Sequence, residues 1–245
     1  REYIAFDGSG FASPEFEGQV PNQDLHGLEP VDYIILTHPD FMEQAQRMLN
    51  LHQTIDGMEG MIVTPIQVYN EFGSGKQDPA AIRDFVRMLY YKADSASRPK
   101  YLLLLGDASY DYKDRVPGNT NLVPTYQSVE ALKLGYSFVT DDFFGLMDPG
   151  EGVNAWGKSV DIGIGRFPVH TIEQADAMVD KVEKYLTLKP AVFGNWRNDV
   201  CFIADDDDQN LHFNQAEKLQ QMLDTGYKAY NRPKIYIDAF PQVST

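Results

Sequence analysis

The sequence predicts an α/β protein with a doubly wound, mostly parallel sheet. Short apolar, β-branched runs recur along the chain, amphipathic helical stretches separate them, and polar residues follow where the runs end. Strands that alternate with helices favour a parallel sheet whose two faces are both covered. The 245 residues suffice for one large domain or two small ones.

The first 30 residues are expected to form a lead-in segment, because they are rich in glycine and proline and show little periodicity. Within them a short strand is expected only at residues 3–6. The α/β subdomain is expected over residues 31–245 and opens with a strand at 31–37. Pro39 then fits the first turn of a helix whose apolar positions run from Phe41 to His52.

The remaining elements follow from the same two patterns. Asp78 and Pro79 suit the N-cap and the first position of one helix, and Thr171 begins a capping box for another. A connection of about fifty residues follows the third strand and holds seven aromatic residues between Tyr110 and Phe144, so we expect it to be ordered. The other strands are expected at 61–65, 101–107, 160–166, 200–204 and 234–237, and the last helix at 214–223.

The charge and the cysteine count exclude several classes of function. The formal net charge of −15 makes nucleic acid a poor partner and disfavours an anionic membrane surface. No apolar stretch approaches the roughly 20 residues that span a bilayer. The single cysteine, Cys201, excludes an internal disulfide framework. Because it lies inside the apolar run 200–204, we expect it to be buried and structural rather than a nucleophile.

Acidic residues follow the third and fifth strands and stand within the long connection, which directs attention to the carboxyl edge of the sheet. Calcium takes carboxylate oxygens from loops, so a calcium site at Asp107, Asp141 and Asp142 is one prediction. The alternative is solvated acidic loops in which aspartates cap the next segment. Residues 70–77 and 163–168 fail as phosphate-binding glycine motifs, and the five histidines show no HxxxH spacing.

The motifs taken in order resemble the gingipain-type cysteine peptidases, whose α/β fold is related to that of the caspases. The resemblance extends over nearly the whole chain and is closest to the sortase-like peptidases of the type IX secretion system. It is carried by the segments at 6–10, 22–26, 36–39, 103–111, 123–128, 140–145, 164–167 and 200–204.

The resemblance implies a cysteine endopeptidase or sortase that processes carboxy-terminal signals of secreted cargo at the surface of a Gram-negative bacterium. Its implied partners are protein substrates and other type IX secretion components, with no required cofactor. The family's catalytic histidine follows a His-Gly strand end and its cysteine follows a later strand, so both are expected beyond Thr245. The chain is thus expected to be the amino-terminal half of the peptidase domain, without the dyad.

Within this chain the resemblance implies substrate-facing or loop-ordering roles rather than catalytic ones. These roles fall on Asp107, Asp111, Asp141, Asp142, Arg166 and Asp208. In gingipains an acid after the fifth strand selects a basic substrate side chain, but the matching position falls near Leu211, so arginine specificity is not implied. The alternative function is a non-catalytic pseudo-peptidase or cell-surface binding module. A nucleotide-binding domain is disfavoured by the failed glycine motifs.

Overall fold

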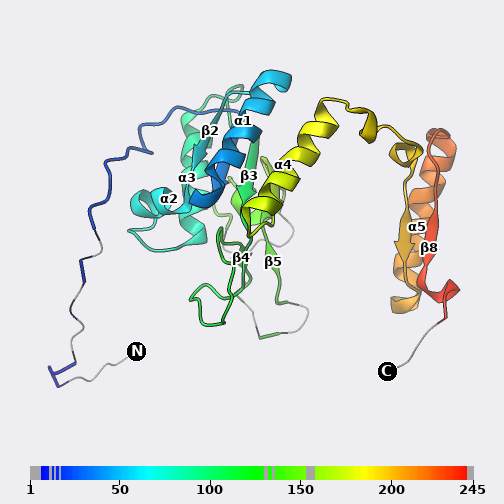
Figure 1. The fold of residues 1–245 in the computed structure, drawn as a ribbon. Coiled ribbons are helices and arrows are strands. Elements are labelled where there is room, and N and C mark those ends of the chain that lie inside the picture. Colours follow the sequence, from blue (N-terminus) through cyan, green and yellow to red (C-terminus); the bar gives the residue numbers. More distant parts are fainter. Residues whose placement is uncertain are drawn as a thin grey trace. The chain divides into compact units, whose positions relative to one another are not determined.

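The computed structural model describes residues 7–10, 13, 15–16, 18–129, 132–133, 136–152 and 158–241. The chain forms two compact units, Arg1–Val179 and Asp180–Thr245, called unit 1 and unit 2 below (Figure 1). The residues expected to form one α/β subdomain, 31–245, are divided between the two units. The short strand expected at 3–6 lies outside the described residues.

Unit 1 contains a four-stranded sheet in which every pair of neighbours is parallel, as the sequence predicts. Its two central strands are almost wholly buried, which explains why their sequences are continuous apolar runs rather than alternating ones. The strand order is β2-β1-β3-β6, with β1 at Tyr33–Thr37, β2 at Gly60–Val63, β3 at Tyr101–Leu105 and β6 at Gly163–Phe167 (Figure 1).

Helices pack on the sheet of unit 1. Ile34 and Leu104 belong to the core that also contains Phe85 and Leu89 of one of these helices. Residues next to them in the strands point to the opposite face, by the two-residue period of a strand. These helices are α1 at Met42–Asp56, α2 at Pro65–Phe72 and α3 at Pro79–Lys92, with a 3-10 turn at Pro39–Phe41 before α1. Helix α4 at Ile172–Leu186 runs across the boundary between the units, and its Asp176 binds Gln44 and Arg47 of α1.

Helix α2 was not predicted, because residues 61–65 read as one strand. The strand ends at Val63, and Thr64 caps the helix. The Thr64 side chain accepts a hydrogen bond from the Gln67 backbone N–H, and the Gln67 side chain accepts one from the Thr64 N–H. This capping box, with Pro65 at the first helical position, was the available sequence signal.

The lead-in segment is tied to unit 1 by the Glu71 carboxylate of α2. It accepts hydrogen bonds from the Leu25 N–H at 2.8 Å, from the Gln23 side-chain amide at 2.8 Å, and lies 2.7 Å from His26 Nδ1. Burial raises the pKa of Glu71, but the hydrogen bonds from Leu25, Gln23 and His26 outweigh it and lower the pKa to about 2. Leu25 itself is buried in the main core.

The long connection after β3 carries local structure of its own. A two-stranded antiparallel pair, β4 at Tyr126–Gln127 and β5 at Val139–Thr140, precedes a 3-10 turn at Asp142–Gly145. Phe143 is buried and stacks on Tyr126 with ring centroids 4.4 Å apart. Aromatic packing therefore anchors this part of the connection to the core.

Unit 2 has a separate sheet, so the fifth and sixth strands do not extend that of unit 1. Strand β7 at Phe202–Ala204 pairs in parallel with β8 at Lys234–Tyr236, and helix α5 at Asp207–Gly226 packs on one face through Ala216. Short 3-10 turns occur at Pro190–Val192, Asn195–Asn198 and Ile237–Ala239.

The expectation that Cys201 is buried is wrong. Strand β7 begins one residue later, and its side chains alternate, so Phe202 packs toward α5 while Cys201 and Ile203 are exposed. An apolar run was mistaken for a strand covered on both faces, whereas only one face of this strand is covered.

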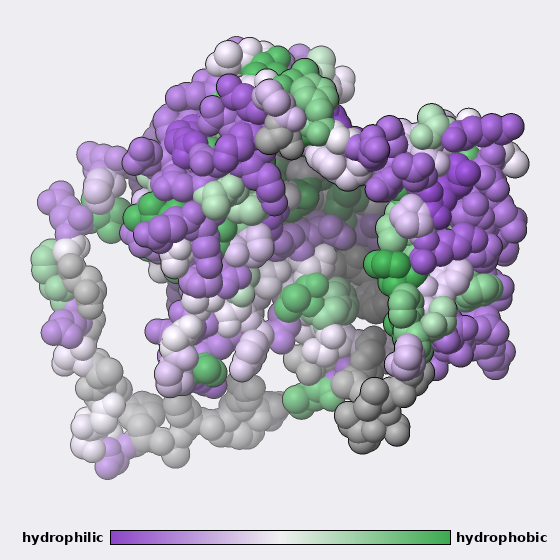
Figure 2. All heavy atoms as spheres, turned by 45° about the vertical axis from the view of Figure 1, so that its right-hand side comes forward, coloured by the Kyte–Doolittle hydropathy of each residue, from purple (hydrophilic) through white to green (hydrophobic). Residues whose placement is uncertain are grey.

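No helix in the described part of the chain is both long enough and apolar enough to cross a membrane. On the face that Figure 2 shows, hydrophilic residues predominate and hydrophobic ones occur in small groups.

Candidate functional site

The carboxyl ends of β1, β3 and β6 meet at one edge of the sheet in unit 1. Thr37 pairs with Leu105, and Leu105 in turn pairs with Phe167. The polar residues that follow these strands therefore start from adjacent positions. This is the edge at which open α/β sheets bind their ligands.

Arg166, on the outer strand β6, makes several hydrogen bonds at this edge. Its guanidinium forms a bidentate pair with the Asp141 carboxylate, with Nε–Oδ2 at 2.7 Å and Nη2–Oδ1 at 2.8 Å. Nη1 also donates to the Gly106 and Val123 carbonyls, both at 2.8 Å, and Nη2 donates to the Pro124 carbonyl at 3.1 Å. All five N–H donors of the guanidinium are thus used.

The pair is well shielded from water, since the side chain of Arg166 is 12% exposed and that of Asp141 is 23% exposed. An arginine whose donors all bind fixed oxygen atoms holds those oxygens in place. Arg166 therefore joins the loop after β3, the segment before β4 and the turn after β5. The sequence named both Arg166 and Asp141, but their pairing comes only from the fold.

Asp107 orders the start of the long connection. Its carboxylate accepts a 2.6 Å hydrogen bond from Thr120 Oγ1, and its carbonyl accepts bonds from the Leu122 and Val123 N–H groups. The preceding Gly106 has φ of +146°, and a Cβ there would lie 2.9 Å from Val123 Cγ2, so glycine suits this turn. Thr120 had no distinguishing signal in the sequence.

Asp111 closes a tight loop through backbone hydrogen bonds. Its buried carboxylate accepts the Val116 N–H at 2.7 Å, together with those of Arg115 and Lys113. The hydrogen bond from Val116 is the largest cause of the lowered pKa of Asp111, which burial opposes and the other two bonds support. These bonds hold the Asp111 carboxylate against the backbone of residues 113–116.

Asp142 and Asp208 have exposed side chains and lie outside this network. Asp142 is the first residue of the 3-10 turn, and its N–H donates to Thr140 Oγ1. Asp208 belongs to unit 2, where it has φ of 54° and lies 3.7 Å from His212 Nε2. The left-handed conformation continues through Gln209 and Asn210, so the regular part of α5 starts after them.

The structure does not group the three predicted calcium ligands with other ligating side chains. In the described part of the chain, no cluster of three or more His, Cys, Asp or Glu side chains is arranged to hold a metal ion. Asp141 is paired with Arg166 and Asp107 with Thr120. Calcium binding here stays a prediction.

The calcium prediction is tested by thermal unfolding. If Asp107, Asp141 or Asp142 ligates calcium, chelation should lower Tm, because an ion that binds only the folded state stabilises it by mass action. The shift should vanish in Asp142→Asn, whose exposed side chain makes this a mild change. An unchanged Tm at saturating calcium removes the site.

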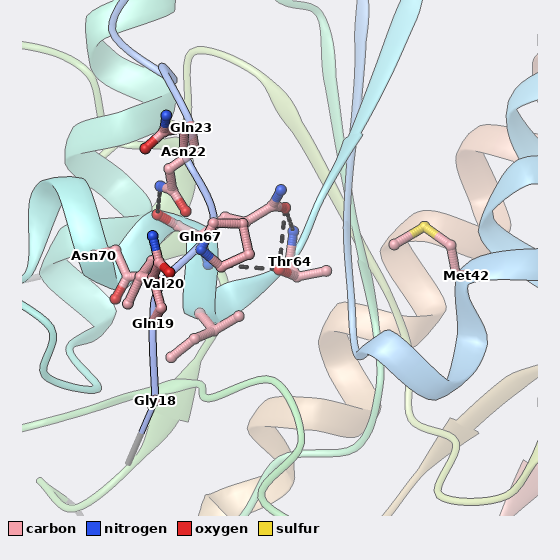
Figure 3. Close-up of a pocket in the computed structure, with 11 residues that line it drawn as sticks. Gly18, Gln19, Val20, Asn22, Gln23, Met42, Thr64, Gln67 and Asn70 are labelled. Atoms are coloured by element: carbon pink, nitrogen blue, oxygen red, sulfur yellow. Dashed lines mark hydrogen bonds between the residues drawn. The ribbon is translucent and has the colours of Figure 1, made fainter. Parts of the chain in front are cut away.

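A groove lies at the same edge of unit 1, on the side of β2 and β1. It has a volume of about 480 Å³ and is bounded by the lead-in residues, the start of α1 and the start of α2. In Figure 3 the lead-in residues stand on one side, Met42 on the other, and Thr64 between them. The sequence contained no pattern that marked this groove.

A family model and solved structures relate this chain to known proteins. The sequence model of the family described as "Peptidase family C25" matches residues 26–245. A crystal structure of dimeric latent PorU from Porphyromonas gingivalis is 33% identical, with a TM-score of 0.60, over 70% of this chain and 17% of that chain. No curated protein matches the sequence.

A second structure, the complex of the RgpB pro- and mature domains from Porphyromonas gingivalis, shares the fold. It is 16% identical, with a TM-score of 0.55, over 86% of this chain and 43% of that chain. The described chain therefore corresponds to less than half the length of either matched chain.

Proposed function

Because this chain belongs to peptidase family C25, the gingipain family, we propose that it forms the amino-terminal part of a cysteine peptidase domain. The family match over residues 26–245 carries this proposal. The resemblance to the gingipain-type peptidases that the motifs indicate is confirmed, as is the α/β fold. The finer proposal is a sortase-like enzyme that processes carboxy-terminal signals of type IX secretion cargo, supported by the likeness to PorU.

We propose that the catalytic Cys–His dyad lies outside these 245 residues. A nucleophilic cysteine needs a histidine within hydrogen-bond reach. Cys201 is the one cysteine of the sequence, and each of the five histidines contacts a residue of its own unit. The contacts are His26 with Glu71, His38 with Asp40, His52 with Asp56, His170 with Gln174 and His212 with Asp208.

The proposed contribution of this chain is to order the loops that face the substrate. Arg166 ties three segments together at the carboxyl edge, and Asp107 and Asp111 shape the connection between them. The proposed partners are protein substrates and other secretion components. The proposed location is the outer surface of a Gram-negative cell.

The test compares the full-length protein with the 245-residue chain on a cargo protein that carries its carboxy-terminal signal. The full-length protein should cleave the cargo and lose activity on treatment with iodoacetamide, whereas residues 1–245 should not cleave. In the full-length protein, Cys201→Ser should retain activity.

Two results would contradict the proposal. Cleavage that Cys201→Ser abolishes would place the nucleophile in this chain. Binding of cargo without cleavage by the full-length protein would favour the non-catalytic module, and the family membership would then describe ancestry only.

A further inference from the structure

We infer that the groove between the lead-in segment and α2 binds an extended, uncharged stretch of polypeptide. The inference rests on the proposed function only for identifying that polypeptide as part of a protein substrate. Three features of the groove carry it: its lining chemistry, the free backbone along one wall, and its position on the sheet.

Among the described residues that line the groove, exposed apolar side chains combine with amides and none is charged, in a chain whose net charge is −15. Val20, Met42 and Ile66 are 55%, 41% and 54% exposed, although all three are apolar. Burying such side chains under a partner is favourable in proportion to the area removed from water. With no charge to compensate, an anionic or cationic occupant would lose hydration without gaining an ion pair.

Polar atoms in the groove match a peptide backbone. Gln19, Asn22 and Asn70 each offer a donor and an acceptor on one side chain, the combination that a peptide unit requires. Among the described residues, the backbone of 18–22 makes no hydrogen bond. Its C=O groups, and its N–H groups except at Pro21, which has none, are therefore available to an extended partner, as in recognition by strand addition.

The wall that carries this free backbone is itself held in place. Gln23, next in the chain, donates to the Gln67 carbonyl at 2.8 Å (Figure 3). It also donates to the Glu71 carboxylate at 2.8 Å. At the bottom of the groove, Thr64 and Gln67 form the two reciprocal hydrogen bonds of the α2 capping box. The groove is thus built before any partner arrives, which reduces the ordering that binding would require.

The position of the groove suits a substrate that continues toward the Arg166 network. Thr64 follows β2 and Met42 is the first residue of α1, at the carboxyl edge of the sheet, where Arg166 is the last but one residue of β6. The order β2-β1-β3-β6 places the groove and Arg166 at opposite ends of that edge. Strands lie about 4.8 Å apart, so an extended segment of roughly five residues covers the distance.

The test is direct binding to an amidated octapeptide of alternating valine and threonine, attached to a sensor through biotin. Surface plasmon resonance with the full-length protein should give a Kd on the order of 10–100 µM, as for a transient contact. Ile66→Asp should raise Kd by about tenfold or more. The matched control is Ile55→Asp on α1, outside the groove at 42% exposure, which should leave Kd unchanged.

A second peptide, with glutamate in place of two central valines, should bind more weakly, because the groove offers no cation. Equal binding by wild type and Ile66→Asp, tighter binding of the glutamate peptide, or no binding of either peptide would each overturn the inference. Cleavage of cargo without octapeptide binding would overturn it while leaving the proposed function intact. Octapeptide binding that Ile66→Asp weakens, in a protein that does not cleave cargo, would support the groove and remove the peptidase proposal.

Discussion

Arg166→Ala is expected to lower the free energy of unfolding of unit 1 by about 3 kcal/mol, the largest effect anticipated for a single substitution here. Removing the guanidinium leaves the Asp141 carboxylate in a largely buried place without its partner. The substitution also removes the N–H groups that donate to the carbonyls of Gly106, Val123 and Pro124. Partial exposure of the pair places the expected value near the lower end of the range for buried ion pairs.

Urea denaturation at pH 7 measures this loss, and hydrogen exchange locates it. Exchange should rise first in residues 106–124, the segments that Arg166 joins. Arg166→Lys should recover part of the stability, since it keeps the charge but not the bidentate geometry. The control is Lys92→Ala, which removes the exposed pair with Glu29 and should cost no more than about 1 kcal/mol. Equal costs for Arg166→Ala and Lys92→Ala would contradict the role given to Arg166.

Glu71→Gln is expected to destabilise unit 1 by about 2–3 kcal/mol at neutral pH and to loosen the lead-in segment. The pKa of Glu71 is lowered to about 2 in the folded chain, against an ordinary value near 4.5. A lowered pKa contributes stability above the ordinary value, and that stability is lost as the pH falls toward the folded value. The difference in free energy of unfolding between wild type and Glu71→Gln should therefore reach its full size at pH 7 and disappear near pH 2.

Unfolding curves taken between pH 2 and pH 7 measure this dependence. Limited proteolysis should cut Glu71→Gln ahead of Leu25 sooner than wild type, because the carboxylate holds the backbone there. Glu59→Gln, at an exposed position, should behave like wild type throughout. A constant difference between wild type and Glu71→Gln across this pH range would show that the carboxylate charge is not what holds the lead-in segment.

Several elements could be predicted because their signals are local. The run at 101–107 predicts β3, and Asp78 with Pro79 marks the start of α3, where the Asp78 carboxylate accepts the Ala80 N–H. Helix α2 was missed although its capping box was present, because Thr64 and Pro65 follow an apolar stretch and were assigned to the same strand. The strand expected at 160–166 is β6, which begins at Gly163 rather than at residue 160.

By itself, the sequence determined the parallel α/β class, the family and the acidic residues around the carboxyl edge. The reason is that hydrophobic periodicity, helix capping and the order of motifs depend on residues that are close together in the chain. Only the tertiary structure decided that β7 and β8 pair with each other, that Cys201 is exposed and that Arg166 binds Asp141. The same holds for Glu71, whose partners lie more than forty residues earlier in the chain. The reason is physical: a side chain's hydrogen-bond partners and solvent exposure depend on which distant segments pack beside it.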